Sequence, residues 1–319
     1  MTGWTSADIP AGFASEVSRH PPDPGMPSGR DWLDRLPRLV TEALAAWELR
    51  TDGPTRWGRN AVVLPVRRAD ESTAALKVGW PHREAAHEHL ALRAWAGAGA
   101  VRLLAADPSR GALLLERVDP DQDLDRLSVE DSGRVVGGLL RTLDRPALPQ
   151  LDPLSTHLER LSVRVDEAMA GPAAGVGRLL PRRLLVQGRA LCTELAARPG
   201  VDARLVHTDL HGQNVLHRPT TGQWVVIDPK PMAAIPEFAV APALWNRWPE
   251  VVGSGHPRAH LQQRLETVCD HARRDADLAR ACTITRMLGN ALWLLRAPGP
   301  QVPAEVTVCV TVLKAMLPS

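Results

Sequence analysis

The chain has 319 residues, of which 44% are hydrophobic, and its 38 basic and 36 acidic residues give a net charge of +2. That length suits about two domains, and the apolar content is enough for a hydrophobic core. The balanced charge argues against a protein that binds nucleic acid or a membrane surface. No apolar run approaches the ~18 residues of a membrane span, and the N-terminus lacks a signal-peptide pattern. We therefore expect a soluble, cytoplasmic monomer or dimer.

Two residue types are distributed unusually. The four cysteines, at 192, 269, 282 and 309, form no CxxC pair and no metal-ligand spacing, so buried thiols are expected. Only three of the basic residues are lysines, at 77, 230 and 314, and the rest are arginines. A lysine kept against that bias is a candidate for chemistry that arginine cannot perform.

The N-terminal part predicts a small sheet crossed by one helix. Residues 1–28 are rich in Pro, Gly and Ser and predict a loosely held leader, and an amphipathic helix follows over 31–49, with Pro37 near its start or at a kink. Residues 46–79 predict three short antiparallel strands, the third containing Lys77. A helix over 82–99, ended by glycines, and two more strands over 100–118 complete this part.

Helices dominate the remainder, so the fold class is α+β. Ser128 is placed to cap a helix that reaches about Leu143, with Asp131 three positions on. Helical apolar spacing recurs in five further segments: 153–170, 178–197, 258–276, 277–296 and 303–317. One polar, β-rich island spans 204–230. The expected organisation is a leader over 1–28, an N-terminal region over 29–118 and a helical C-terminal region over 119–319.

The island carries the strongest chemical signal of the sequence. It contains "VHTDLHGQNVL", which matches the catalytic-loop pattern H-R-D-L-x-x-x-N except that Thr208 replaces the arginine. The apolar segment "WVVID" then ends at Asp228, where a metal-binding aspartate is expected, with Pro229 in place of the usual Phe.

Phosphoryl transfer explains this spacing. A carboxylate must accept the proton of the attacking hydroxyl, and two oxygen ligands must hold Mg²⁺ against the phosphates of ATP. Asp209 is the candidate base, and Asn214 and Asp228 are the candidate metal ligands. The donor phosphates also need a cation, for which we predict Lys77, held in place by Glu84 as the preferred partner, with Glu88, one turn later, as the alternative.

The chain resembles the aminoglycoside phosphotransferases, and within them the streptomycin 6-kinase and hydroxyurea phosphotransferase branch. The resemblance covers residues 28–296 and rests on seven segments: "GRDWLDRLPRLV", "WELRTDGP", "AALKVG", "LRAWAGAGAVRLLAAD", "LLLERV", "VHTDLHGQNVL" and "WVVIDPKP". It implies a two-lobed protein-kinase-like fold with ATP in the cleft, and a hinge at Glu116, Arg117 and Val118 whose backbone meets adenine. It also implies a small hydroxyl-bearing antibiotic as acceptor, of streptomycin type at its 6-hydroxyl and cationic, with hydroxyurea or a cyclic-peptide antibiotic as alternatives.

The sequence also departs from the family pattern. The phosphate-covering loop "TDGPTRWGRN" has only Gly53 and Gly58. Ile235 and Ala239 stand where relatives usually have carboxylates, which leaves open how the acceptor is recognised and keeps a non-catalytic, nucleotide-binding pseudokinase as a rival.

Other readings remain open for single residues. His207 is expected to brace the loop, whereas His211 is either solvated or in contact with the substrate. A metallohydrolase would instead use His207, Asp209 and His211 as metal ligands. Trp245 and Trp248 belong to the core or line an acceptor pocket. Four aspartates form either a solvated loop or a rim that attracts a cation: Asp119, Asp121, Asp123 and Asp125. No role is assigned to Lys230, which follows the expected metal-binding aspartate.

Overall fold

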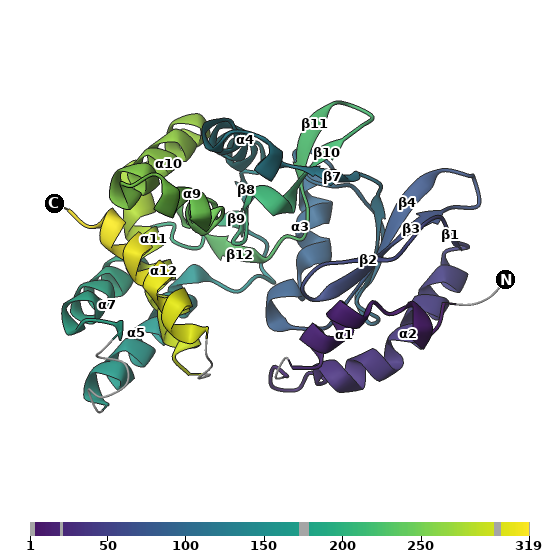
Figure 1. The fold of residues 1–319 in the computed structure, drawn as a ribbon, viewed down its shortest axis with the longest axis horizontal. Coiled ribbons are helices and arrows are strands. Elements are labelled where there is room, and N and C mark those ends of the chain that lie inside the picture. The colour runs from purple at the N-terminus through teal and green to yellow at the C-terminus, as the bar shows by residue number, and fades with distance from the viewer. Residues whose placement is uncertain (1–3, 20–21, 172–178, 297–300, 319) are drawn as a thin grey trace. The chain divides into compact units, whose positions relative to one another are not determined.

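The computed structural model describes residues 4–19, 22–171, 179–296 and 301–318 (Figure 1). The chain divides into two compact units. Unit 1 comprises residues 1–120 and 217–225, and unit 2 comprises 121–216 and 226–319. The first boundary lies close to the expected one, but a short hairpin segment that comes much later in the sequence also belongs to unit 1.

Unit 1 is built on an antiparallel sheet with the order β1-β3-β4-β6-β5, and β2 also pairs with β3. Its strands are β1 (Arg50–Thr51), β2 (Arg56–Trp57), β3 (Ala61–Arg67), β4 (Thr73–Gly79), β5 (Leu103–Asp107) and β6 (Ala112–Glu116). Lys77 lies in the centre of this sheet, opposite Val63 on one side and Leu113 on the other. Buried side chains predominate in β3 and β4 and fill β6, so the sheet holds Lys77 in a rigid frame.

The N-terminal residues pack on this unit, which differs from the expected loose leader. They form η1 (Ser6–Asp8) and α1 (Ala11–Val17), and Phe13 and Val17 are fully buried. Helix α2 (Gly29–Ala46) is capped by Ser28, whose hydroxyl accepts a hydrogen bond from the Asp31 amide at 3.1 Å. Phe13 contacts Trp32 of α2 edge-on, at 6.0 Å between ring centroids. A few large apolar side chains thus anchor a segment whose average composition is that of a loop.

The helix expected over 82–99 forms two shorter pieces, η2 (Arg83–Ala85) and α3 (Glu88–Trp95). It ends because Ala96 and Gly97 adopt left-handed backbone conformations, with φ of 50° and 84°. Helix α3 therefore presents Glu88, rather than Glu84, in its first turn.

Unit 2 is mainly helical, as expected. Its longer helices are α4 (Val129–Thr142), α5 (Leu154–Ala170), α7 (Arg182–Ala196), α10 (Pro257–Ala272), α11 (Ala276–Leu294) and α12 (Val302–Met316). Shorter ones are η3 (Leu124–Arg126), η4 (Gly212–Asn214), η5 (Pro236–Ala239), α8 (Pro242–Trp245) and α9 (Trp248–Gly253). Ser128 caps α4 as expected, accepting a hydrogen bond from the Asp131 amide at 3.0 Å. Part of the helix expected from residue 178 lies outside the described residues.

A small antiparallel sheet at the core of unit 2 positions the polar island. It has the order β12-β9-β8, formed by β8 (Arg145–Pro146), β9 (Arg204–His207) and β12 (Pro231–Ala234). His207 at the end of β9 is opposite Pro231 at the start of β12. Strands β10 (Val215–Arg218) and β11 (Gln223–Val226) follow the island's loop, and β7 (Asp119–Asp123) carries the chain from unit 1 to unit 2. All four cysteines are buried free thiols. No described helix is long and apolar enough to cross a membrane.

Candidate active site

The loop between β9 and η4 is braced by His207. Nε2 of His207 lies 3.2 Å from the Ile227 carbonyl, and Nδ1 accepts a hydrogen bond from the Asp209 amide at 3.1 Å. Burial lowers the pKa of His207 to about 4, so its ring is neutral at pH 7. Because backbone groups engage both ring nitrogens, His207 has the bracing role expected for it and cannot also bind a metal in this arrangement.

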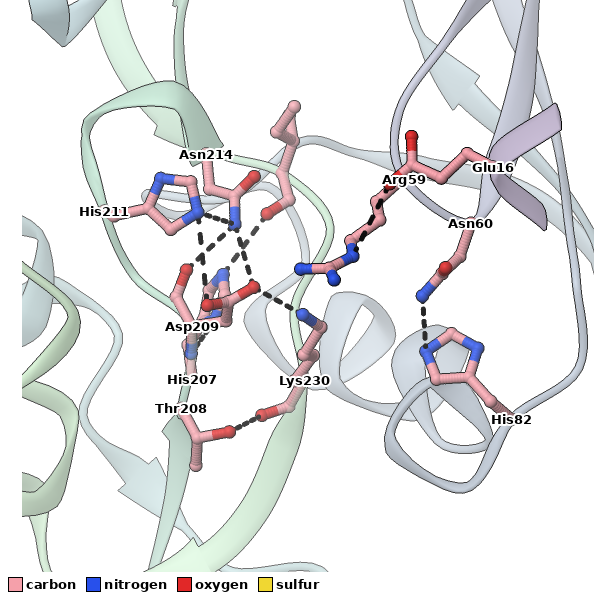
Figure 2. Close-up of polar contacts among 11 residues, drawn as sticks. Glu16, Arg59, Asn60, His82, His207, Thr208, Asp209, His211, Asn214 and Lys230 are labelled. Atoms are coloured by element: carbon pink, nitrogen blue, oxygen red, sulfur yellow. Dashed lines mark hydrogen bonds and ion pairs between the residues drawn. The ribbon is translucent and has the colours of Figure 1, made fainter. Parts of the chain in front are cut away.

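Asp209 follows directly and is half-buried among polar groups (Figure 2). Nζ of Lys230 lies 2.5 Å from its Oδ2, and Nε2 of His211 lies 4.0 Å from its Oδ1. Burial works to raise the pKa of Asp209, but the positive charges, that of Lys230 foremost, lower it overall. The carboxylate is therefore ionised at neutral pH and able to accept a proton or a hydrogen bond.

Asn214 is oriented by the same loop. Its Nδ2 donates to the Asp209 carbonyl at 2.8 Å and lies 3.2 Å from Nε2 of His211. The Asn214 carbonyl accepts a hydrogen bond from the Ile227 amide at 2.9 Å, which ties the loop to the segment before Asp228. These contacts use the nitrogen of the side-chain amide and leave its oxygen for another partner. An amide oxygen presented in this way fits Mg²⁺, which prefers oxygen ligands.

Asp228, the second candidate ligand, has an unusual backbone. Its φ is 50°, in the left-handed region that non-glycine residues rarely adopt. Such strain is concentrated at functional sites, where the surrounding structure over-determines the conformation. Here the Ile227 amide before Asp228 and the β12 pairing after it fix the chain on both sides.

In unit 1, Lys77 is 8% exposed and forms an ion pair with Glu88, whose two carboxylate oxygens both lie 2.7 Å from Nζ. This corrects the preferred pairing with Glu84, which is exposed in η2. The reason is local: the chain tightens into a 3-10 turn at Glu84, and α3 begins only at Glu88. A buried pair of this kind holds the ammonium in one position.

The expected hinge residues use their side chains for structure. Glu116 is 6% exposed and accepts hydrogen bonds from Arg102 and Arg218. Arg117 donates to Asp52 at 2.7 Å and to the Val66 carbonyl at 2.7 Å. The adenine contact expected of Glu116, Arg117 and Val118 would thus be a backbone contact, as the resemblance implies.

Comparison with known proteins identifies the family of the chain. The sequence model of the aminoglycoside/hydroxyurea antibiotic resistance kinases matches residues 46–297. The chain belongs to this family. It is 40% identical to a hydroxyurea phosphotransferase of Kitasatospora aureofaciens over 293 residues, covering 90% of this chain and 80% of the relative. It is 36% identical to a streptomycin 6-kinase of Streptomyces griseus over 297 residues, covering 92% of both.

The fold agrees with this membership. A thermostable mutant of aminoglycoside phosphotransferase APH(4)-Ia, solved with ADP and hygromycin B, matches with a TM-score of 0.56 at 14% identity, covering 86% of this chain and 97% of that one. The expected kinase-like α+β fold and family are thereby confirmed. As a member of this kinase family, the chain is a phosphotransferase that acts on a hydroxyl group.

In this antibiotic resistance kinase, the structure places Lys230, to which the sequence pattern assigned no role, beside the candidate base. The ammonium lies against the candidate base, and the main chain is held by Thr208, whose amide and hydroxyl both donate to the Lys230 carbonyl at 3.0 Å. The available signal was the scarcity of lysine, which singled out Lys230 as much as Lys77.

Two of the four aspartates after the expected hinge have structural roles in this kinase. Asp123 caps η3 by accepting a hydrogen bond from the Asp125 amide at 3.0 Å. Asp125 accepts one from Nε2 of Gln213 at 3.1 Å, and a Cβ at position 212 would lie 2.6 Å from its other oxygen, so a residue larger than Gly212 would displace this side chain. These contacts favour loop support over a cation-attracting rim for Asp123 and Asp125.

A small cavity adjoins the same loop within unit 2. It is lined by Gly212, Asp125, Arg264 and neighbouring residues and has a volume of about 30 Å³. Ligand pockets usually enclose roughly 300–1,000 Å³. The cavity therefore has room for about two water molecules, and an antibiotic must bind elsewhere. Trp245 and Trp248 are both half-buried and do not line it.

The metallohydrolase alternative finds no support in the described residues. Among them, no three His, Cys, Asp or Glu side chains come together as metal ligands. His207 is engaged by the backbone, so the alternating His207, Asp209 and His211 do not provide a ligand triad.

Proposed function

We propose that this kinase transfers the γ-phosphoryl group of ATP, with Mg²⁺, to a hydroxyl of a small antibiotic. The first candidate is the 6-hydroxyl of an aminoglycoside of streptomycin type, because a streptomycin 6-kinase is similar over 92% of both chains. The second is hydroxyurea, because a hydroxyurea phosphotransferase is 40% identical. A cytoplasmic location, where ATP is available, is part of the proposal.

The observation that carries the proposal is the arrangement around Asp209. Its carboxylate is ionised and adjoins an asparagine whose amide nitrogen is engaged and whose oxygen is presented. General-base catalysis needs the ionised carboxylate of Asp209, and divalent-metal binding needs an oxygen ligand such as the side-chain oxygen of Asn214.

Each residue has a defined part in the reaction. Asp209 accepts the proton of the acceptor hydroxyl as its oxygen forms a bond to the γ-phosphorus. The bond between that phosphorus and the bridging oxygen breaks, and its electron pair leaves on ADP. Asn214 and Asp228 would hold Mg²⁺, which neutralises developing negative charge on the phosphates. Lys77, fixed by Glu88, binds the donor phosphates, and the backbone at 116–118 contacts adenine.

An ADP-release assay with ATP and Mg²⁺ tests the proposal. The acceptor panel contains streptomycin, other aminoglycosides, a cyclic-peptide antibiotic and hydroxyurea, and Asp209→Ala is measured beside the wild type. We expect acceptor-dependent ADP release that falls by at least about 100-fold in Asp209→Ala while ATP binding persists. ATP binding without turnover of any acceptor would favour the pseudokinase, and near-normal turnover by Asp209→Ala would refute the assignment of the base.

A further inference from the structure

We propose that Lys230 is a positioning residue that holds Oδ2 of Asp209 and thereby reserves Oδ1 for the acceptor hydroxyl. The inference rests on the assignment of Asp209 as the base in the proposed function. It goes beyond that assignment by stating which carboxylate oxygen takes the proton and what keeps it accessible.

The main chain of Lys230 is fixed beside the base. Its carbonyl accepts hydrogen bonds from both the amide and the hydroxyl of Thr208, each at 3.0 Å. The next residue, Pro231, pairs with His207 in the β9–β12 ladder. Thr208, the residue before Asp209, thus fixes the backbone of Lys230. Its side chain therefore loses little conformational freedom when the ammonium contacts the carboxylate.

The two oxygens of Asp209 have different surroundings (Figure 2). Oδ2 lies 2.5 Å from Nζ of Lys230 and 3.5 Å from Nδ2 of Asn214. Oδ1 lies 4.0 Å from Nε2 of His211, which is beyond hydrogen-bonding distance. Oδ2 is therefore engaged by Lys230, whereas Oδ1 keeps its lone pairs for a hydroxyl, as a general base requires.

Lysine suits this task better than arginine. An ammonium is a compact charge that can engage one oxygen, whereas the planar guanidinium tends to engage both oxygens of a carboxylate. Arginine is the usual cation of this chain, yet the position beside the base is one of only three lysines. The side chains of Lys230 and Asp209 are 22% and 20% exposed, so solvent only partly screens the pair.

Steady-state kinetics with Mg-ATP and an acceptor that the wild type phosphorylates will test the inference. The variants are Lys230→Met, which removes the charge, and Lys230→Arg, which keeps it. Lys314→Met, on the exposed face of α12, is the control. We expect kcat to fall about 100-fold in Lys230→Met, because misorientation of a reacting group has effects of that order. Both KM values should stay within about threefold, and Lys314→Met should match the wild type.

Lys230→Arg distinguishes positioning from simple charge. If Lys230 reserves Oδ1, the arginine variant should lose at least about tenfold in kcat although the charge is retained, because its fork covers both oxygens. Retention of wild-type kcat by either Lys230 variant would overturn the inference. Thermal melting of each variant identifies losses caused by unfolding, and Lys230→Gln replaces Lys230→Met if the latter does not fold.

A double variant separates this inference from the proposed function. Residues that act as a unit are non-additive, so Asp209→Ala/Lys230→Met should be no slower than Asp209→Ala alone. A further tenfold loss in the double variant would show that Lys230 acts independently of Asp209 and would overturn the inference while leaving the base assignment intact. Near-normal activity of Asp209→Ala would instead remove the base assignment and the inference with it.

Discussion

Arg218 donates two hydrogen bonds to one oxygen of Glu116, from Nε at 3.0 Å and from Nη2 at 2.6 Å, although 102 residues separate them. Both residues are buried, at 6% exposure each. Arg218 also donates to the carbonyls of Gly97 and Ala100 at 3.1 and 2.9 Å. The hairpin segment 217–225 is thereby fastened to the sheet of unit 1, at the residue that begins the expected hinge.

Arg218→Met should destabilise the protein strongly. Removing Arg218 takes away the buried cation of Glu116 and leaves, among the described residues, only the exposed Arg102 as an ion-pair partner; breaking a buried ion pair costs up to roughly 3–5 kcal/mol. Arg102→Met is the control, because Arg102 contacts the same carboxylate but its side chain is 59% exposed, and exposed pairs contribute about 1 kcal/mol or less. Urea unfolding measures both.

The double variant Arg218→Met/Glu116→Leu completes this test. If the loss comes from the Glu116 charge that has lost its buried partner, replacing both Arg218 and Glu116 by apolar residues should recover much of the stability. A double variant as unstable as Arg218→Met would instead assign the loss to the unsatisfied carbonyls of Gly97 and Ala100.

Glu88→Gln should lower kcat/KM for ATP by about 100-fold, while Glu84→Gln leaves it unchanged. Glu88 holds the ammonium of Lys77 through both carboxylate oxygens, and an amide offers it only one neutral acceptor. Glu84 is charged and nearby in sequence but exposed, which makes it a matched control. Initial rates over a range of ATP concentrations measure the effect, and equal losses in both variants would contradict the pairing.

Local sequence patterns could place those residues of the candidate site whose positions depend on spacing within one segment. Asp209 and Asn214 share one loop, and Asp228 ends the following apolar segment, so a motif locates all three. The contacts of Lys230 with Asp209 and of Glu88 with Lys77 depend instead on strand register and on where α3 begins. The composition of residues 1–28 is typical of a loop and does not indicate that Phe13 is fully buried. That burial depends on a contact with Trp32, a residue of another segment. Tertiary packing decided these features.

Two neighbouring glycines of α4 should respond oppositely to alanine. A Cβ at Gly137 would lie 2.6 Å from the Val268 carbonyl oxygen of α10, so Gly137→Ala must push the two helices apart. A Cβ at Gly138 would meet no atom within 4 Å, and alanine there should stabilise the helix by up to about 1 kcal/mol. We expect Gly137→Ala to destabilise by about 1–3 kcal/mol, as overpacked sites do. Thermal or urea unfolding of the two variants checks the direction of each change, and equal effects would contradict the close α4–α10 packing.

His157 of α5 should make stability depend on pH. Its ring contacts Phe238 edge-on at 6.1 Å between centroids. Burial lowers its pKa to about 4, and the charged groups that act on it are Arg286 of α11, Arg164 and Arg160 of α5, and Asp152, which opposes them. The unfolded chain takes up this proton near pH 6.5, whereas the folded protein does so only near pH 4. Stability is therefore fully present above pH 6.5 and is lost as the pH falls toward 4.

This linkage predicts that proton uptake by His157 in the unfolded chain lowers the free energy of unfolding by about 2 kcal/mol as the pH falls from 7 to 5. His157→Gln, which does not titrate, should show a correspondingly smaller loss over that interval. His271→Gln, at an exposed position of α10, should follow the wild type. Urea unfolding at pH 7, 6 and 5 measures the difference, and comparison with the wild type cancels the contributions of other groups, including His207, whose pKa is also about 4. Parallel pH profiles for the wild type and His157→Gln would contradict the prediction, because they would mean that His157 takes up its proton in the folded protein as readily as in the unfolded chain. Packing of the ring against Phe238, beside three arginines, opposes such a protonation.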